Sequence, residues 1–302
     1  LKAMKPSGNV DMDVEVHIPF ATPAKSRLTG TLATRNVGFK IAAADLSVEN
    51  DDTQIVLAGD SATIIIMTLR INEQQIAVSG QLSNPLKPKA ILLITSPDLN
   101  LDRLFPQNKP NNQISTGEKD QSEKPAIEVK SSNKELPPLA RKLTADLQMK
   151  AEQGRYRGLQ FQKLNLNLRY KHGVIEHYAL DFGVDQARVH TQGTADLRDL
   201  GRVTFSVDPN ITALQLEKVA PVFGFEKPPF TGPMSLTGQL QGHTGSRQAL
   251  LTSLAGNLVT EMGPGRVTKA GRTGDLILKI LSMTSIRSIF SGSIVDDLKD
   301  QG

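Results

Sequence analysis

The chain alternates hydrophobic and polar residues with a period of two over much of its length. The clearest stretch runs from residue 143 to residue 207 and contains successive alternating segments separated by short turns. Side chains two residues apart lie on the same face of a strand, so this pattern predicts strands with one apolar and one polar face. We expect a long antiparallel meander with strands at residues 143–151, 159–170, 174–184, 189–197 and 203–207.

The alternation changes phase once inside the second of these strands. Phe161 and Leu164 are both apolar although three positions separate them, whereas Leu164, Leu166 and Leu168 follow the period of two. An extra residue in one strand of an antiparallel pair shifts the phase in this way. The sequence therefore predicts a β-bulge between Phe161 and Leu164.

The first third of the chain shows the same alternation in shorter segments. The polar run from Glu49 to Asp52 and the Asn72-Glu73 pair are typical of turns between strands. After Pro97 the pattern favours a short helix over residues 99–105, which Pro106 ends. The strands expected before it cover residues 10–18, 28–32, 37–43, 54–58, 62–71, 75–82 and 89–95.

Residues 107–135 have no apolar periodicity and are rich in Asn, Ser, Lys, Glu and Pro. Such a segment buries too little apolar surface to offset its ordering entropy, which favours a flexible linker over a long ordered loop. We therefore predict a first β unit at residues 1–106, a linker or insertion at 107–137 and a second β unit at 138–302.

The two units share a pattern that indicates an internal repeat. Ser79-Gly80-Gln81 leads into a strand, a Ser96-Pro97 pair and a leucine-rich segment that ends at Pro106. Gln192-Gly193-Thr194 leads in the same order to Asp208-Pro209 and a segment that ends at Pro221. Each copy reads as several strands closed by a short helix.

The last part of the chain adds strands and two predicted helices. Strands are expected at residues 233–241 and 257–262, with a helix at 246–254 between them. Residues 274–290 carry an apolar stripe at helical spacing. We expect this amphipathic helix to pack on an open end of the sheet, with membrane or partner contact as the alternative.

The composition limits how the apolar face is covered. In 302 residues, hydrophobic residues make up 38% and aromatic residues 4%, and Trp and Cys are absent. A closed β-sandwich normally has bulkier inward side chains, and the absence of Cys excludes disulfides and cysteine zinc sites. The formal charge of +4 is modest and is typical of an ordinary solvated surface.

No signal peptide or transmembrane segment is recognisable in the sequence. The longest apolar runs, Ile64–Met67 and Ala90–Ile94, are far shorter than the roughly 20 residues that a membrane-spanning helix needs. The chain begins at Leu1 and alternates almost at once, which suggests a piece of a longer protein whose targeting segment lies outside it.

Candidate catalytic and metal-binding groups are scattered. His177 and His190 lie on strands predicted to be neighbours, but no third ligand has suggestive spacing. Asp181 and Asp185 are expected at solvated strand ends. The basic residues near Arg155 lack the interleaved aromatics of a single-strand nucleic-acid platform. We therefore predict no enzyme activity, no cofactor, no metal and no nucleic-acid partner.

Several segments of this chain resemble the AsmA family of Gram-negative envelope proteins. The resemblance covers nearly the whole chain apart from the predicted linker and consists of diffuse strand patterns rather than a catalytic signature. It rests on the segments Gly158-Leu159-Gln160-Phe161, Gly173-Val174-Ile175, Gly193-Thr194-Ala195-Asp196-Leu197, Gly238-Gln239-Leu240 and Leu250-Leu251-Thr252-Ser253-Leu254-Ala255-Gly256 in the second unit, and Ser79-Gly80-Gln81-Leu82-Ser83-Asn84-Pro85-Leu86-Lys87-Pro88 in the first.

The resemblance implies a fold, a location and a function. It implies a mainly β protein with a long, curved sheet of repeated multi-strand units, short helices and a hydrophobic groove. It also implies a periplasmic domain anchored in the inner membrane by a helix outside this sequence. In this family the groove is thought to carry phospholipid between the inner and outer membranes and to support outer-membrane biogenesis. A scaffolding protein that assists outer-membrane assembly without carrying lipid is the alternative.

A sheet with an apolar face needs a covering layer, and its periodicity does not say which layer covers it. A second sheet packed face to face and acyl chains in a groove satisfy the same pattern; the resemblance favours the groove. The expected partners are then phospholipid acyl chains together with membrane or envelope proteins. The candidate groove residues are Leu147, Met149, Leu159, Phe161, Leu164, Leu166, Leu168, Tyr170, Tyr178, Leu180, Phe182, Val203, Phe205 and Val207.

Overall fold

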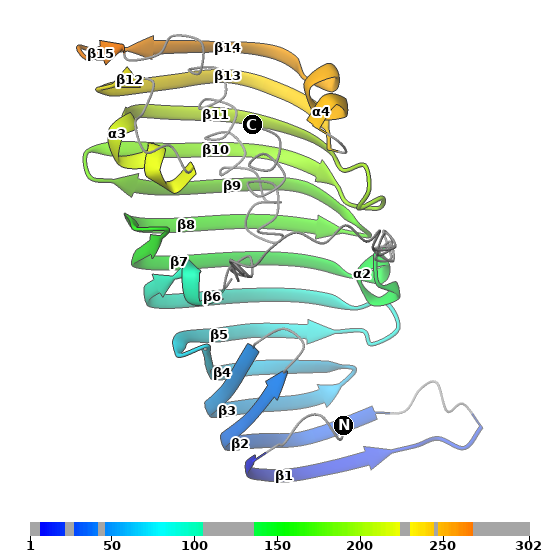
Figure 1. Ribbon diagram of the computed structural model, residues 1–302. Helices are drawn as coiled ribbons and strands as arrows, with labels where there is room; N and C mark the ends of the chain where they lie inside the picture. The colour runs from blue at the N-terminus through cyan, green and yellow to red at the C-terminus, as the bar shows by residue number, and fades with distance from the viewer. Residues whose placement is uncertain are drawn as a thin grey trace, which may run out of the picture.

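The protein contains one long open sheet of 13 strands that follow one another in chain order (Figure 1). The computed structural model describes residues 7–21, 27–41, 46–104, 136–223, 230–244 and 247–267. The strands of this sheet are β1 (Ser7–His17), β2 (Arg27–Ile41), β3 (Leu46–Gly59), β4 (Ser61–Ile71), β5 (Gln74–Ser83), β6 (Lys89–Asn100), β7 (Thr144–Tyr156), β8 (Leu159–Lys171), β9 (Val174–Val184), β10 (Ala187–Asp196), β11 (Thr204–Gln215), β13 (Pro233–His243) and β14 (Ala255–Met262).

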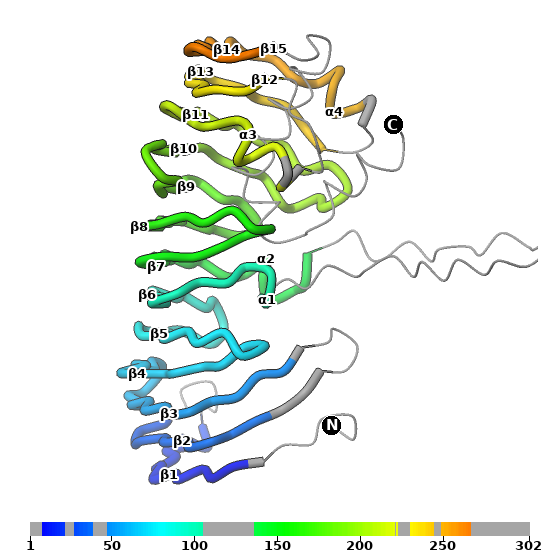
Figure 2. The backbone as a smooth tube through the Cα atoms, turned by 60° about the vertical axis from the view of Figure 1, so that its left-hand side comes forward, coloured from blue at the N-terminus to red at the C-terminus, as the bar shows by residue number. Residues whose placement is uncertain are grey.

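Few other elements accompany this sheet within the described residues. A separate two-stranded sheet pairs β12 (Phe230–Thr231) with β15 (Arg266–Val267). The helices are short: α1 (Leu101–Leu104), α2 (Pro138–Lys142), α3 (Leu216–Val219), the 3₁₀ segment η3 (Ala220–Phe223) and α4 (Arg247–Ser253). The predicted fold class, a mainly β protein with a long, curved sheet and short helices, is confirmed (Figure 2).

One strand pair departs from the antiparallel prediction. β6 and β7 run parallel, with Lys89 opposite Thr144 and Asn100 opposite Arg155. All other neighbours in the 13-stranded sheet are antiparallel. The chain connects β6 to β7 through α1, residues 105–135 and α2, a connection long enough for a parallel return. The sheet is therefore continuous across the predicted linker.

Two breaks between strands and one helix start that were predicted in the first unit are wrong. The run from Glu49 to Asp52 lies inside β3, and the strands predicted at 28–32 and 37–43 are one strand, β2. The Asn50 side chain is buried and bonds the Thr34 and Thr53 hydroxyls, so the polar run is satisfied within the sheet. The helix predicted from residue 99 begins only at Leu101.

The second unit also contains longer strands than predicted. The strand expected to end at Val207 continues through Pro209 to Gln215 as β11. Pro209 lies opposite Thr191 of β10, an unusual position for a residue that cannot donate a ladder hydrogen bond. The predicted helix over 274–290 and the predicted linker segment 107–135 lie outside the described residues.

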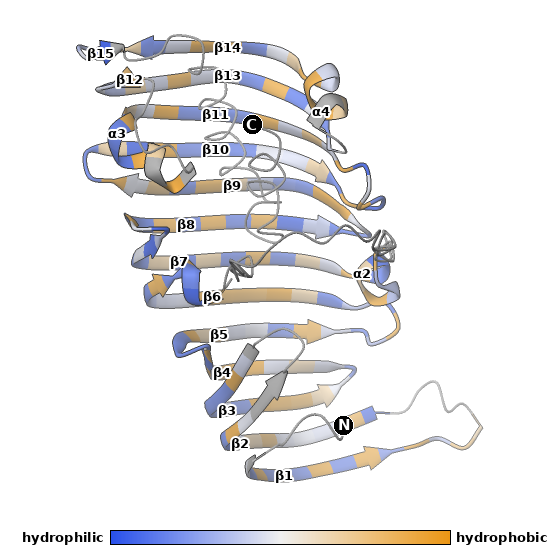
Figure 3. Ribbon diagram, in the orientation of Figure 1, coloured by the Kyte–Doolittle hydropathy of each residue, from blue (hydrophilic) through white to orange (hydrophobic). Residues whose placement is uncertain are grey.

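A row of one residue from each strand runs across the whole sheet on one face. Successive pairings link these 13 residues, which we call the central row: Met12, Leu32, Ile55, Ile64, Gly80, Leu92, Leu147, Leu168, Tyr178, Gly193, Val207, Leu240 and Gly256. Directly paired residues point to the same face, so these side chains lie on one face, which we call the apolar face. Polar residues alternate with them along most strands (Figure 3).

Short helices border the apolar face at both ends of its strands. At one end, Leu101 of α1 and Leu216 and Val219 of α3 pack into the same cluster as Phe161. At the other end, the Tyr170 hydroxyl donates a hydrogen bond to the carbonyl of Ala140 in α2 at 2.7 Å. Figure 2 shows the helices on the same side of the sheet.

Arg157 links α1 to η3 at the first of these two ends. Its backbone N–H donates to both carboxylate oxygens of Asp102 in α1 at 2.9 Å. Its guanidinium donates to the carbonyl of Val222 in η3 at 3.1 Å. Because the β7–β8 turn holds both helical segments, the border is continuous from α1 to η3.

The β-bulge predicted in the second unit is present. The β8–β9 register shifts between Gln162 and Asn165, and Lys163 between them has a left-handed backbone with φ 54°. Consequently Phe161 and Leu164 both face the apolar side. A second phase change of this kind occurs in β11, where Ala213 has φ 54° and the register shifts between Ile211 and Leu214.

The repeat glycines occupy equivalent positions in the two units. Gly80 in β5 and Gly193 in β10 are both members of the central row. A Cβ atom built on either would lie 2.0 Å from a carbonyl oxygen of the next strand, that of Ile91 or Ser206. Only glycine permits such a close approach between strands. Glycine is therefore required at both positions, and the internal repeat stays a prediction.

Candidate functional site

The structure brings all fourteen predicted groove residues together on the apolar face. Those at one end of the strands, such as Phe161, Leu164 and Phe182, contact the cluster beside α1 and α3. Those at the other end, such as Tyr178, Val203 and Phe205, form a second cluster. Leu147, Leu166 and Leu180 lie between the two clusters. The predicted set is thus one continuous surface, and its contact with lipid stays a prediction.

The fourteen residues differ in how much of each side chain is exposed. Seven are buried: Leu159, Phe161, Leu166, Tyr178, Leu180, Val203 and Val207. The other seven are half-buried: Leu147, Met149, Leu164, Leu168, Tyr170, Phe182 and Phe205. Phe161 and Phe182 also make an edge-to-face contact with ring centroids 6.1 Å apart. The half-buried positions are therefore the more accessible part of this set.

Sequence reasoning missed the most accessible part of the apolar face. On β1, Val10, Met12 and Val16 are 59%, 70% and 55% exposed, and they share the face of the central row. Their alternation was recognisable in the sequence, but it gave no indication that this end would be open. These side chains are thus much more exposed than those of the two buried clusters.

Tyr178 places a phenol group in the buried part of the apolar face. Its side chain is 2% exposed. Burial raises the pKa of the Tyr178 hydroxyl to about 12, and the charge on Asp208 acts in the same direction, while the Thr191 hydroxyl opposes them. The folded protein therefore favours the neutral, protonated form of the Tyr178 phenol.

This pKa predicts a loss of stability in strong alkali. The folded pKa lies above the ordinary value of 10.0, so the stabilising contribution is complete below pH 10 and is lost as the pH rises toward 12. A shift of this size corresponds to about 2–3 kcal/mol. Urea titrations at several pH values should show this loss in the parent protein, and a much smaller one in Tyr178→Phe. An equal loss in both proteins would contradict the assignment.

The polar face carries the ionisable residues considered from the sequence. The sequence places His177 and His190 on neighbouring strands, where they could approach each other, but the structure does not pair them: His190 lies opposite Asp181, and His177 opposite Arg169. The His190 Nδ1 and Asp181 Oδ1 atoms are 2.5 Å apart. No cluster of three or more His, Asp or Glu residues suited to a metal ion occurs among the described residues.

The other expected charges are mostly paired at the surface. Asp185 pairs with Lys218 of α3, and Arg169 pairs with Asp146 at 3.2 Å. Arg157 lies over the Tyr156 ring at 5.4 Å in addition to its backbone contacts. In the part of the chain that the structure describes, no helix is long and apolar enough to cross a membrane.

Comparison with known proteins supports the resemblance seen in the sequence. The chain is 25% identical over 206 residues to Protein AsmA of Escherichia coli (strain K12), an alignment that covers 67% of this chain and 33% of that protein. The matched region thus spans about a third of that relative's length. No solved structure matches the chain. The model of the AsmA family matches residues 31–293, which is most of the sequence, and the chain therefore belongs to the AsmA family.

Proposed function

We propose that this protein is a non-enzymatic lipid-binding module of the cell envelope whose apolar face holds the acyl chains of phospholipids. In this role it would guide phospholipid along the sheet between the inner and outer membranes. A periplasmic position on an inner-membrane anchor belongs to the same proposal. Family membership supports an envelope role, and the arrangement of the sheet supports the choice of ligand.

The central row is the observation that carries the proposal. Each of the 13 strands contributes an apolar residue, a tyrosine or a glycine to this row, with no charged residue in it. The row crosses the junction between the two units without interruption, through Leu92 and Leu147. An elongated ligand without polar groups along its length would therefore meet no charged residue in this row.

The chemistry of acyl chains suits the exposed part of this face. Among the described residues no second sheet packs on β1 and β2, and the side chains of Val10 and Met12 remain open. Each methylene that moves from water to such a surface contributes about 0.8 kcal/mol. A single chain of ordinary length thus gains several kcal/mol without any directed polar contact.

Photo-crosslinking at alternate residues tests the proposal with controls on the same strand. A photoreactive amino acid is placed at Met12, Leu147 or Leu168 on the apolar face, and at Asp13, Gln148 or Asn167 on the polar face. After irradiation in bacteria, mass spectrometry should find phospholipid adducts at the first three positions and few at the second three. Equal labelling of the two faces would contradict lipid binding.

The same experiment separates lipid binding from scaffolding. Protein adducts without lipid adducts at the apolar positions would favour the scaffolding alternative. Native mass spectrometry of the purified protein gives an independent result, because co-purifying phospholipid is expected only for a lipid-binding protein.

A further inference from the structure

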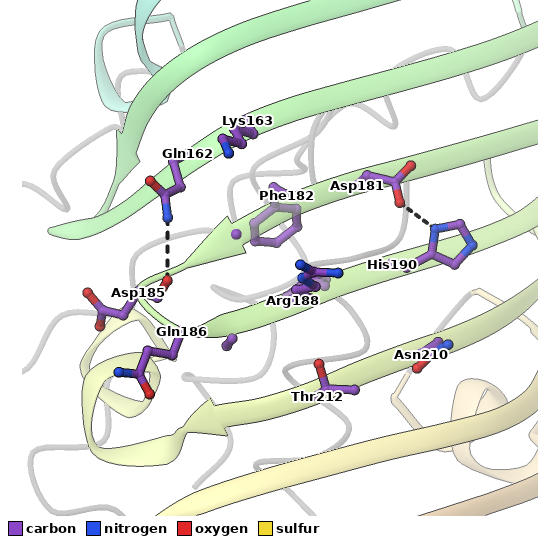
Figure 4. A pocket seen from close by; sticks show the side chains of 13 residues that line it. Gln162, Lys163, Asp181, Phe182, Asp185, Gln186, Arg188, His190, Asn210 and Thr212 are labelled. Atoms are coloured by element: carbon purple, nitrogen blue, oxygen red, sulfur yellow. Dashed lines mark hydrogen bonds and ion pairs between the residues drawn. The ribbon is translucent and has the colours of Figure 1, made fainter.

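A depression of about 600 Å³ lies over β8–β11, and most of its charged and polar lining residues are on the polar face (Figure 4). Two cross-strand rows line much of it. One row comprises Gln162, Gly183, Arg188 and Thr212, and the other comprises Asp181, His190 and Asn210. Four consecutive strands therefore contribute side chains to one place.

Two local features shape the depression over these rows. Gly183 lies between Gln162 and Arg188, and a Cβ atom at Gly183 would come within 3.3 Å of the Gln162 Cγ. The absence of a side chain there leaves the floor open. The bulge at Lys163 places this residue next to Gln162 on the polar side, because Phe161 and Leu164 both face the other way.

The charges around the depression leave two cations without a partner among the described residues. Asp181 interacts with His190, and Asp185 pairs with Lys218. Lys163 and Arg188 line the depression and form no ion pair with any residue that the structure describes. With His190 counted as neutral, the three cations Lys163, Arg188 and Lys218 exceed the two carboxylates of Asp181 and Asp185 by one charge.

We propose that this depression binds a phosphate group, as a phosphate monoester or diester. The Arg188 guanidinium presents paired N–H donors that match two phosphate oxygens, and Lys163 adds a second positive charge. Thr212 and Asn210 supply neutral donors from the next strand. The group comes either from a lipid headgroup or from a soluble phosphorylated molecule. The charged lining residues lie on the polar face, so this proposal does not rest on acyl-chain binding to the apolar face.

Binding of a soluble phosphate ester and of a phospholipid tests this site. Glycerol phosphate is titrated into the protein by calorimetry, and phosphatidylglycerol vesicles are tested by co-sedimentation. Arg188→Gln and Lys163→Gln should each weaken binding about tenfold. Arg169→Gln removes one positive charge from the same face, on the strand of Lys163 but outside the depression, and it should change binding little. Sensitivity to Arg188 with glycerol phosphate indicates a soluble source, and sensitivity with vesicles alone indicates a headgroup.

Two further variants distinguish a built site from a generally basic surface. Asp181→Asn keeps an acceptor for His190 but removes a negative charge, so it should strengthen binding. Gly183→Val fills the floor without changing charge, so it should abolish binding, with Gly183→Ala as the milder substitute if the valine protein does not fold. Equal weakening by Arg169→Gln and Arg188→Gln, or no response to both Asp181→Asn and the Gly183 variants, would overturn the proposal.

Discussion

Replacing Gly193 by valine should unfold the protein or lower its melting temperature by about 10 °C. The Cβ atom would lie 2.0 Å from the Ser206 carbonyl oxygen and 2.9 Å from the Tyr178 ring. Relief requires β10 and β11 to separate, which breaks their hydrogen bonds, at a cost of about 4 kcal/mol or more. The whole stability of a domain is typically about 5–15 kcal/mol, so this loss is a large part of it.

A valine at the neighbouring Thr194 is the matched control. Thr194 is exposed on the polar face of the same strand, and valine suits a strand at least as well as threonine. Thermal melting followed by circular dichroism should therefore leave Thr194→Val near the parent protein. A Gly193→Val protein that melts within about 2 °C of the parent would refute the close approach of the two strands.

A carboxylate introduced on the apolar face should unfold the protein at a buried position and leave its stability almost unchanged at an exposed one. Leu180 is 4% exposed, so Leu180→Glu places a charge in a buried site without a partner, at a cost of several kcal/mol. Met12 is 70% exposed on the same face, so Met12→Glu should change the free energy of unfolding by less than about 0.5 kcal/mol.

Urea titration of the two variants measures this difference directly. Loss of folded protein in Leu180→Glu together with an unchanged midpoint in Met12→Glu is the expected result. Met12→Glu should also reduce phospholipid adducts at a crosslinker placed on Leu32, its partner on β2. A stable Leu180→Glu protein would show that this part of the face hydrates freely.

The sequence predicted the faces of the strands better than their ends. Period-two alternation depends only on which side a residue faces, and it placed Leu147, Leu168 and Tyr178 correctly on one surface. The ends of β3 were missed because Asn50, a residue typical of turns, finds partners inside the sheet in Thr34 and Thr53. Such partners are distant in sequence, so local composition does not reveal them.

The relation between strands was harder to infer than the strands themselves. Short turns imply antiparallel neighbours, and this holds from β7 to β11. The parallel pairing of β6 and β7 depends on a connection without periodicity, which leaves the direction of return open. The residues Lys163, Arg188 and Thr212 of the proposed phosphate site are far apart in sequence and ordinary in type, and only the arrangement of the strands brings them together.

The spacing of the strands sets the length of the central row. Adjacent strands lie about 4.8 Å apart, so a row across 13 strands is roughly 58 Å long. The hydrocarbon core of a bilayer is about 30 Å thick, so one acyl chain extends to about half of that. Roughly four acyl chains would fit end to end along the row. In the proposed function the row is thus long enough for several lipids in single file, and the number of bound lipids is expected to increase with the number of strands.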